Sequence, residues 1–235
     1  MEKIYIVIPT YNEKDNIEKI ISKIFEIKIG NLNILVVDDN SPDGTGAVVE
    51  RIKKNDARVD ILHREGKEGL GKAYIAGFKE VLNRGAELIF EMDADLSHDP
   101  KYLLPILEAS KNNDLVLGSR YIKGGGVANW NIIRRLISRF GNIYAKVILG
   151  VPYNDLTGGF KCYKRKVLET INLDSLDSLG YNFQIETTYK AHQAGFKIAE
   201  VPIIFTERVE GESKFNPKIM LEGFWRVLAL RFKRK

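Results

Sequence analysis

The chain has 235 residues, of which 44% are hydrophobic and 29% are charged. This balance supplies a core for one large domain and excludes a disordered or fibrous chain. A single cysteine, Cys162, excludes an intramolecular disulfide, so we expect a reducing compartment. Residues 1–10 lack the long apolar stretch of a signal peptide, and nowhere do eighteen apolar residues follow one another, so we expect no membrane-spanning segment.

The charge is divided unevenly along the chain. Residues 1–119 contain 16 Lys and Arg against 21 Asp and Glu, whereas residues 120–235 contain 20 against 10. A basic surface attracts anionic partners. The second half therefore predicts contact with phosphates, nucleic acid or an anionic membrane face.

Strands and helices alternate through the first half. Short apolar runs predict strands, and apolar residues three and four apart predict helices. The expected strands cover residues 3–9, 33–38, 59–63, 87–93 and 114–118, and the expected helices cover residues 15–25, 46–53, 70–83 and 100–111. This alternation predicts the α/β class, with a mostly parallel sheet covered by helices on both faces.

The regular alternation of strands and helices ends after Gly118. We expect a flexible stretch over residues 124–126, helices over 131–149 and 183–194, and strands near 160–163 and over 197–205. We divide the chain into a main domain over residues 1–212 and a basic amphipathic helix over residues 213–235. That helix suits either a membrane interface or docking on the protein itself.

Polar side chains follow four of the expected strands. They occupy residues 10–13 (TYNE), 38–41 (DDNS), 93–95 (DAD) and 119–120 (SR). Ligands of open parallel sheets bind at the carboxyl ends of the strands. We therefore expect these four clusters to meet in one crevice.

Asp93 and Asp95 are the sharpest signal in that crevice. Two carboxylates separated by one small residue can reach the same Mg²⁺ or Mn²⁺, which is typically held by one or two carboxylates plus substrate phosphates. The alternative is a solvated turn. Asp39, after the second strand, suits hydrogen bonds from a ribose or a base edge, unless it only shapes the turn over residues 41–44.

The basic half adds candidate phosphate ligands. Residues 120–146 carry six cations and no acid, and Arg134 and Ser138 are neighbours on one helical face. Arg208 and Lys214 flank a glycine-containing segment that suits folding over a diphosphate. The alternative for each is a solvated cation. The three histidines are scattered without metal-ligand spacing, and we expect Cys162 to be a buried core residue.

Several motifs together resemble a known family. PTYNE at residues 9–13, VVDDNSPDGT at 36–45, MDADLSH at 92–98 and GSRY at 118–121 are similar to the inverting GT-A glycosyltransferases of family 2. DLTGGFK at 155–161 and RVEGESK at 208–214 narrow the resemblance to the polyprenol-phosphate mannosyltransferases. The resemblance covers about residues 3–230, with residues 1–212 as the GT-A catalytic domain.

The resemblance implies a mannosyl transfer from GDP-mannose to dolichyl or another polyprenyl phosphate, with Mg²⁺ or Mn²⁺ as cofactor. The positions implied to bind the donor are Pro9, Tyr11, Glu13, Val37, Asp39, Asp93, Ala94, Asp95, Arg120, Arg208 and Lys214. Arg120, Arg134 and Ser138 match positions for the acceptor phosphate. Asp93 and Asp95 match the metal positions, and Asp95, Arg208 and Lys214 carry the catalytic roles.

The resemblance further implies a peripheral enzyme on the cytosolic face of a membrane, in a short form without transmembrane helices. A membrane-anchoring subunit is left open as a partner. One rival keeps the fold and uses UDP-glucose or another sugar nucleotide as donor. A nucleic-acid binder leaves the carboxylate pair unexplained, so we expect no nucleic-acid partner.

Overall fold

The computed structural model describes residues 2–176, 181–207 and 217–232. The strands are β1 (Ile4–Thr10), β2 (Leu32–Asp38), β3 (Val59–His63), β4 (Leu88–Glu91), β5 (Leu115–Ser119), β6 (Gly126–Ala128), β7 (Lys161–Lys164), β8 (Ile198–Pro202) and β9 (Ile204–Thr206). The α-helices are α1 (Lys14–Glu26), α2 (Thr45–Asn55), α3 (Leu70–Asn83), α4 (Leu103–Ser110), α5 (Ile132–Leu149), α6 (Arg165–Thr170), α7 (Tyr181–Gln193) and α8 (Pro217–Phe232). Two short 3₁₀ helices are η1 (Pro100–Tyr102) and η2 (Leu173–Ser175).

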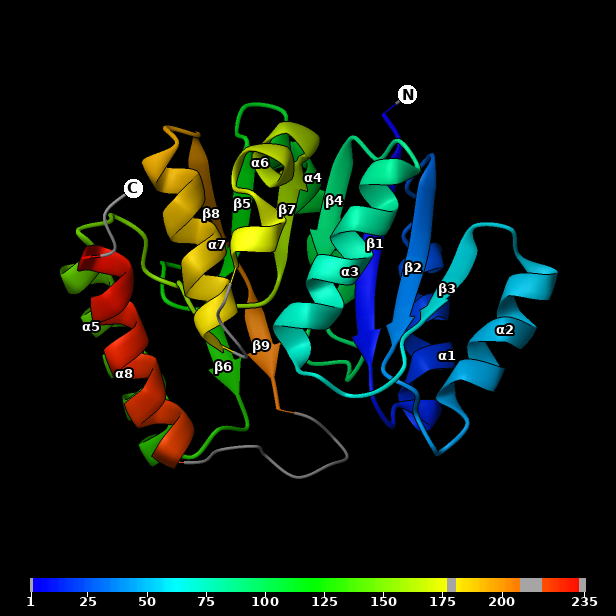
Figure 1. Ribbon diagram of the computed structural model, residues 1–235, viewed down its shortest axis with the longest axis horizontal. Coiled ribbons are helices and arrows are strands. Elements are labelled where there is room, and N and C mark those ends of the chain that lie inside the picture. The colour runs from blue at the N-terminus through cyan, green and yellow to red at the C-terminus, as the bar shows by residue number, and fades with distance from the viewer. Residues whose placement is uncertain (1, 177–180, 208–216, 233–235) are drawn as a thin grey trace.

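Seven of the described strands form one sheet, in the order β3-β2-β1-β4-β7-β5-β8 (Figure 1). Its strands pair in parallel except for β7, which is antiparallel to both β4 and β5. The prediction of a mostly parallel sheet is therefore confirmed. Strand β7 runs backwards because the chain enters it from the loop over residues 154–157, which is bonded to Arg120 at the carboxyl end of β5.

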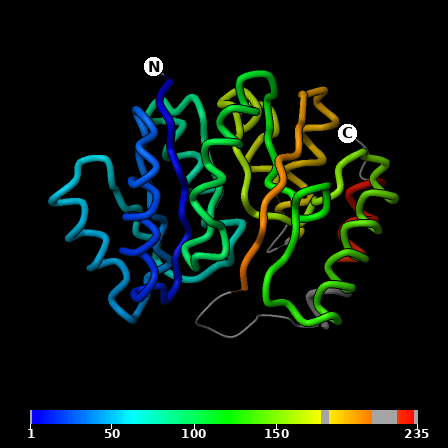
Figure 2. The backbone as a smooth tube through the Cα atoms, turned by 180° about the vertical axis from the view of Figure 1, so that it is seen from behind, coloured from blue at the N-terminus to red at the C-terminus, as the bar shows by residue number. Residues whose placement is uncertain are grey.

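Helices cover both faces of the sheet. On one face α3, α6 and α7 bury their apolar residues, and on the other α1, α2 and α4 do so (Figures 1 and 2). Helix α3 approaches β1 so closely that a Cβ on Gly77 would lie 2.4 Å from Cγ1 of Val7. Only glycine fits there without a shift of its neighbours, so α3 packs directly onto the sheet.

The second half departs from the expected elements at two places. Residues 124–126, expected to be flexible, lead into β6, which pairs with β9 in a separate two-stranded sheet. The single strand expected over residues 197–205 is divided at Ile203 into β8 and β9. Ile203 donates from its main-chain N–H to Ser119 (3.0 Å) and accepts from Gly126 (2.9 Å), so the chain changes partners at this residue.

Helices α5 and α8 lie side by side beyond the β8 edge of the sheet (Figures 1 and 2). The rings of Tyr144 and Phe224 stack 4.4 Å apart, and the Tyr144 hydroxyl donates to the Phe224 carbonyl at 3.0 Å. The C-terminal helix is thus docked on the protein. The expected boundary between residues 212 and 213 falls outside the described residues.

The outer side of α5 is unusually apolar. Its exposed residues include Ile132, Ile133, Leu136, Phe140, Ile143 and Val147, each at least 52% exposed. None of the helices in the described part of the chain combines the length and apolar character that a membrane span needs.

Candidate active site

The ends of β1 and β2 are tied together by Asp38. Its Oδ1 accepts from the Thr10 hydroxyl at 2.8 Å and from the Ser41 hydroxyl at 2.6 Å, and the Ser41 oxygen accepts from the Asn12 main chain at 3.0 Å. These bonds close the turn that follows β2 onto the turn that follows β1. Asp38 therefore shapes these two turns, and the contact of its neighbour Asp39 with a nucleoside stays a prediction.

Asp39 is buried at the carboxyl end of β2 and forms an ion pair with Arg64. Burial raises the pKa of the Asp39 carboxyl, and the Arg64 guanidinium works against that rise. Arg64 also donates to Glu68 at 3.1 Å. The sequence did not single out Arg64, because it lies 25 residues away on the segment after β3.

Other predicted donor residues lie along the same two strands. Pro9 of β1 is the register partner of Val37 of β2. Val37 is fully buried in the core, and its contact with a nucleoside stays a prediction. Tyr11 follows β1, and the ammonium group of Lys67 lies 3.9 Å from its ring centroid. Glu13 begins the turn into α1, and its main chain donates to Thr45 at 3.0 Å.

The acidic pair follows β4, as the sequence predicts. Asp93 accepts a hydrogen bond from the Tyr74 hydroxyl of α3 at 3.2 Å. Asp95 is buried, and its Oδ1 accepts from both the hydroxyl (2.5 Å) and the main chain (3.0 Å) of Ser97. These contacts fix the orientation of each carboxylate, and the buried Ala94 lies between the two residues in the chain.

His98 supports the segment over residues 92–99 that carries the acidic pair, here called the acidic loop. Its Nδ1 accepts from the Asp93 main chain at 3.1 Å, and its ring stacks on Phe160 with centroids 5.0 Å apart. Because Nδ1 is an acceptor, the ring proton of the neutral form lies on Nε2. Burial lowers the pKa of His98, in keeping with a neutral ring. The sequence offered no signal for this role.

The acidic pair fits a hard divalent cation whose remaining ligands come from a substrate. The described residues contain no group of three or more His, Cys, Asp and Glu side chains suited to a metal. Two carboxylates with diphosphate oxygens and water are the usual set for Mg²⁺ and also suit Mn²⁺. Gly159 is a neighbour of the pair, since a Cβ built on it would lie 3.9 Å from Asp93 Oδ2, an ordinary contact distance.

A buried polar cluster lies beneath the acidic loop. The Glu91 carboxylate accepts from the Tyr163 hydroxyl at 3.0 Å and from the side-chain amide of Gln184. Lys161 donates to the Gln184 carbonyl at 2.7 Å. Burial raises the pKa of Glu91 to about 7 and lowers the pKa of Lys161 to about 8. This cluster anchors α7 to the centre of the sheet at Glu91, which precedes Asp93 by two residues.

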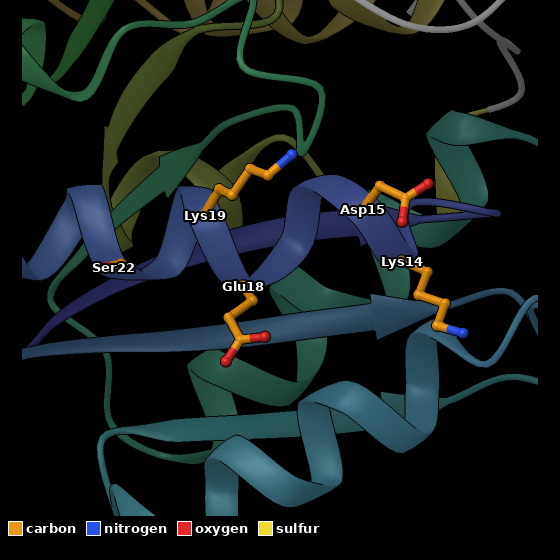
Figure 3. A pocket seen from close by; sticks show the side chains of 5 residues that line it. All are labelled: Lys14, Asp15, Glu18, Lys19 and Ser22. Carbon is orange, nitrogen blue, oxygen red and sulfur yellow. The ribbon is translucent and has the colours of Figure 1, made fainter.

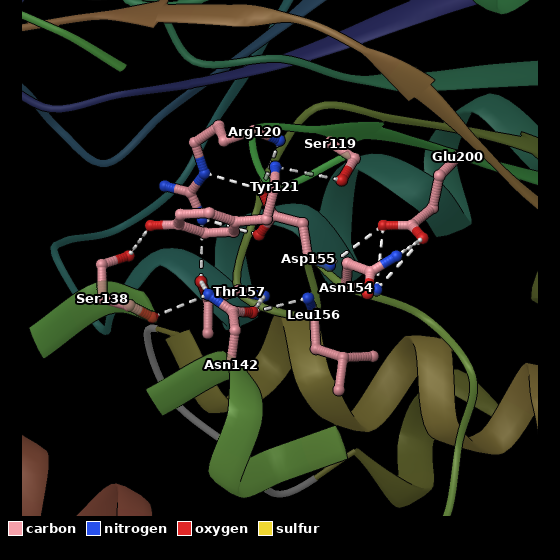
Figure 4. Close-up of polar contacts among 10 residues, drawn as sticks. All are labelled: Ser119, Arg120, Tyr121, Ser138, Asn142, Asn154, Asp155, Leu156, Thr157 and Glu200. Carbon is pink, nitrogen blue, oxygen red and sulfur yellow. Dashed lines mark hydrogen bonds and ion pairs between the residues drawn. The ribbon is translucent and has the colours of Figure 1, made fainter. Parts of the chain in front are cut away.

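Arg120 lies at the carboxyl end of β5, in a buried ion pair with Asp155 (Figure 4). Its Nε and one terminal nitrogen donate to the two Asp155 oxygens at 2.7 Å each, and that nitrogen also donates to the Thr157 hydroxyl at 2.8 Å. Glu200 and Asn142 hold the same loop through their own hydrogen bonds. Arg120 therefore orders the loop, and its contact with a phosphate stays a prediction.

Arg134 and Ser138 lie one turn apart on α5, as predicted. Arg134 forms an ion pair with Glu207 at 2.5 Å, and its guanidinium carbon lies 4.2 Å from the Trp130 ring centroid. The Ser138 hydroxyl accepts from the Tyr121 hydroxyl at 2.7 Å (Figure 4). Both side chains are thus oriented by neighbours from other elements. Arg208 and Lys214 lie outside the described residues.

A surface hollow of about 520 Å³ lies away from these clusters (Figure 3). It is lined by Lys14, Asp15, Glu18, Lys19 and Ser22, all exposed on the outer side of α1. No strand-end residue contributes to it. The hollow is the solvated face of a surface helix, and the polar clusters at the strand ends remain the candidate active site.

The profile described as Glycosyl transferase family 2 matches residues 5–171, which include the acidic pair, Arg120 and Arg134. This match spans more than half of the chain. The chain belongs to glycosyl transferase family 2. It is a glycosyltransferase, and its sheet and helices form the GT-A-like fold of its structural neighbours.

Two curated relatives match nearly the whole glycosyltransferase. A polyprenol monophosphomannose synthase from Mycolicibacterium smegmatis is 44% identical over 228 residues, which are 96% of this chain and 86% of the relative. An undecaprenyl-phosphate mannosyltransferase from Micrococcus luteus is 42% identical over 221 residues, which are 94% of this chain and 90% of the relative.

Solved structures share the fold at low sequence identity. A glucosyl-3-phosphoglycerate synthase from Mycobacterium tuberculosis, in complex with Mn²⁺, UDP and phosphoglyceric acid, is 17% identical with a TM-score of 0.69 and covers 100% of this chain and 80% of its own. A mannosyltransferase from Pyrobaculum calidifontis, in complex with GDP-Man and Mn²⁺, is 18% identical with a TM-score of 0.62. That match covers 98% of this chain and 63% of the neighbour.

Proposed function

We propose that the glycosyltransferase transfers mannose from GDP-mannose to dolichyl or another polyprenyl phosphate, giving a β-linked lipid mannosyl phosphate. The acidic pair at the strand ends carries this proposal, because two oriented carboxylates suit a metal-bound diphosphate while the acid-free α5 suits an anionic acceptor. The names of the two curated relatives support the mannosyl and polyprenyl classes. The Pyrobaculum neighbour, solved with GDP-Man and Mn²⁺, supports the donor.

Asp93 and Asp95 would hold Mg²⁺ or Mn²⁺ on the donor diphosphate. The bound ion would act as a Lewis acid toward the departing GDP. Tyr11, Glu13 and Asp39, together with Pro9 and Val37, would bind the nucleoside at the ends of β1 and β2. Arg120 would complete the donor site at the end of β5.

The acceptor needs no protein base, because its phosphate is already an anion. One of its oxygens attacks the anomeric carbon while the bond from that carbon to the GDP oxygen breaks on the opposite side, so the configuration inverts. Arg134 and Ser138 would hold the lipid phosphate for this attack. Arg208 and Lys214 would close over the diphosphate and exclude water.

A polyprenyl acceptor requires the enzyme to work at a membrane surface. We propose a peripheral position on the cytosolic face, in which residues 213–235 and the apolar side of α5 contact lipid. The exposed Ile133 and Leu136 of α5 alternate with Arg135 and Arg139, the pattern of an interfacial helix.

The direct test is a transfer assay with GDP-mannose, a polyprenyl phosphate and Mn²⁺, followed by chromatography of the lipid. We expect a mannosyl lipid, and a panel that includes UDP-glucose should give less product. Asp95→Asn should lower turnover by at least about 10²-fold, the scale for losing one electrostatic element. Asp99→Asn, on an exposed carboxylate of the same loop, is the matched control and should retain activity. Lipid product from UDP-glucose alone would overturn the proposed donor.

A further inference from the structure

Three aromatic rings make a continuous path between the two sides of the candidate site. The centroids of Trp130 and Phe205 lie 5.5 Å apart at 71°, and those of Phe205 and His98 lie 5.4 Å apart at 78°. Both contacts have the edge-to-face geometry that aromatic pairs prefer. The three residues come from the segment before α5, from β9 and from the acidic loop.

The two ends of this path contact residues that the proposed function assigns to different substrates. Trp130 lies under the guanidinium of Arg134, on the acceptor side. His98 accepts from the main chain of Asp93, on the donor side. The buried indole Nε1–H of Trp130 has no acceptor among the described residues, so the ring contacts hold this side chain.

The main chain of β9 follows the same path. The Thr206 N–H donates to the Ser97 carbonyl of the acidic loop, and the Glu207 N–H donates to the Ala128 carbonyl of β6, both at 3.3 Å. The Glu207 carboxylate also pairs with Arg134. A displacement of the acidic loop would therefore shift α5 through two routes, the aromatic rings and the main chain of residues 206–207.

We propose that Trp130, Phe205 and His98 form an aromatic bridge that joins the donor side of the site to the acceptor side. They are positioning residues, acting through Asp93 at one end and Arg134 at the other. The identities of the two substrates rest on the proposed function. Because packed side chains move between discrete arrangements, binding of the donor should change the surroundings of the Trp130 side chain. Since coupling between binding sites is reciprocal, binding of the acceptor should change donor affinity by the same factor.

Fluorescence of Trp130 tests the bridge without turnover. The chain has two tryptophans, so Trp225→Phe leaves Trp130 as the sole tryptophan, and excitation at the red edge of the absorption band avoids the tyrosines. We expect its emission to change saturably when Mn²⁺–GDP is added. His98→Asn in the same background keeps an acceptor for the Asp93 N–H but removes the ring, and it should abolish the change. Constant emission while calorimetry reports binding of Mn²⁺–GDP would overturn the bridge.

A second variant separates coupling from stability. Phe205→Leu should raise both the Kd for Mn²⁺–GDP and the KM for the polyprenyl phosphate, by roughly 2- to 30-fold. The control is Phe25→Leu at the C-terminal end of α1, away from the strand ends, which removes a ring that lies 3.9 Å from the Arg58 guanidinium carbon. It should lower the melting temperature and leave both constants unchanged. Equal changes in the two variants, or none in Phe205→Leu, would contradict the bridge.

The two proposals fail in different ways. Wild-type protein that forms no mannosyl lipid, while Trp130 responds to Mn²⁺–GDP, overturns the proposed acceptor and leaves the bridge standing. An active enzyme in which Trp130 emission does not change on binding of Mn²⁺–GDP overturns the bridge alone. Protein that does not bind Mn²⁺–GDP overturns both.

Discussion

Helices α1 and α5 have the same kind of amphipathic sequence and opposite placements. In α1, Ile17, Ile20 and Ile24 are fully buried against the sheet. In α5, Ile132 is 74% exposed and Phe140 is 67% exposed. Helix α1 joins two paired parallel strands and must lie over them, whereas α5 lies beyond the sheet edge and contacts the body mainly through its C-terminal half. An apolar stripe therefore establishes a helix without saying what the stripe faces.

Truncation of the two stripes should give the largest contrast in stability. Ile20→Ala leaves a cavity between α1 and the sheet and should lower the free energy of unfolding by about 2–5 kcal/mol. Phe140→Ala removes an exposed ring, and its effect should stay within about 0.5 kcal/mol. Urea unfolding followed by circular dichroism measures both. Equal losses in the two variants would mean that the α5 stripe is covered in solution.

The exposed stripe of α5 should instead matter for lipid. The double variant Ile133→Glu and Leu136→Glu removes two apolar anchors and should weaken sedimentation with vesicles of anionic phospholipid by at least about 10-fold. Leu104→Glu, at a residue of α4 that is 51% exposed, is the matched control and should bind vesicles like the wild type. Unchanged binding of the double variant would remove α5 from the membrane contact.

The smallest effect concerns acid stability in the first half. Burial acts to raise the pKa of Asp60, but hydrogen bonds from Lys53 and Arg84 lower it to about 2. A folded pKa below the usual value means that the contribution of Asp60 is present above about pH 4 and is lost as the pH falls toward 2. The difference in melting temperature between wild type and Asp60→Asn should therefore shrink over this window. A constant difference would show that its ion pairs add no net stability.

Much of the site followed from strand order. Because the carboxyl ends of parallel strands share one edge, the sequence could place the clusters at Asp39, Asp93 and Arg120 at the same edge of the sheet. That they meet in one crevice stays a prediction. The burial of Cys162 was also predicted correctly. The assignments of Arg208 and Lys214 stay predictions, since both lie outside the described residues.

The contacts that orient those residues could not be predicted. Asp155 reaches Arg120 across 35 residues, and the role of His98 depends on where the acidic loop folds back. Strand β7 was expected near residues 160–163, but its antiparallel direction depends on the loop that precedes it. Nothing in the local sequence around any of these residues names its partner.

The sequence alone determined most of the strands and helices and where the acidic and basic groups fall, because these properties depend mainly on neighbours within a few positions. The tertiary structure alone decided which carboxylate meets which arginine, how three rings line up between two sides of the site, and that one apolar stripe stays outside. Those outcomes depend on how distant elements pack, and short-range spacing carries no record of that packing.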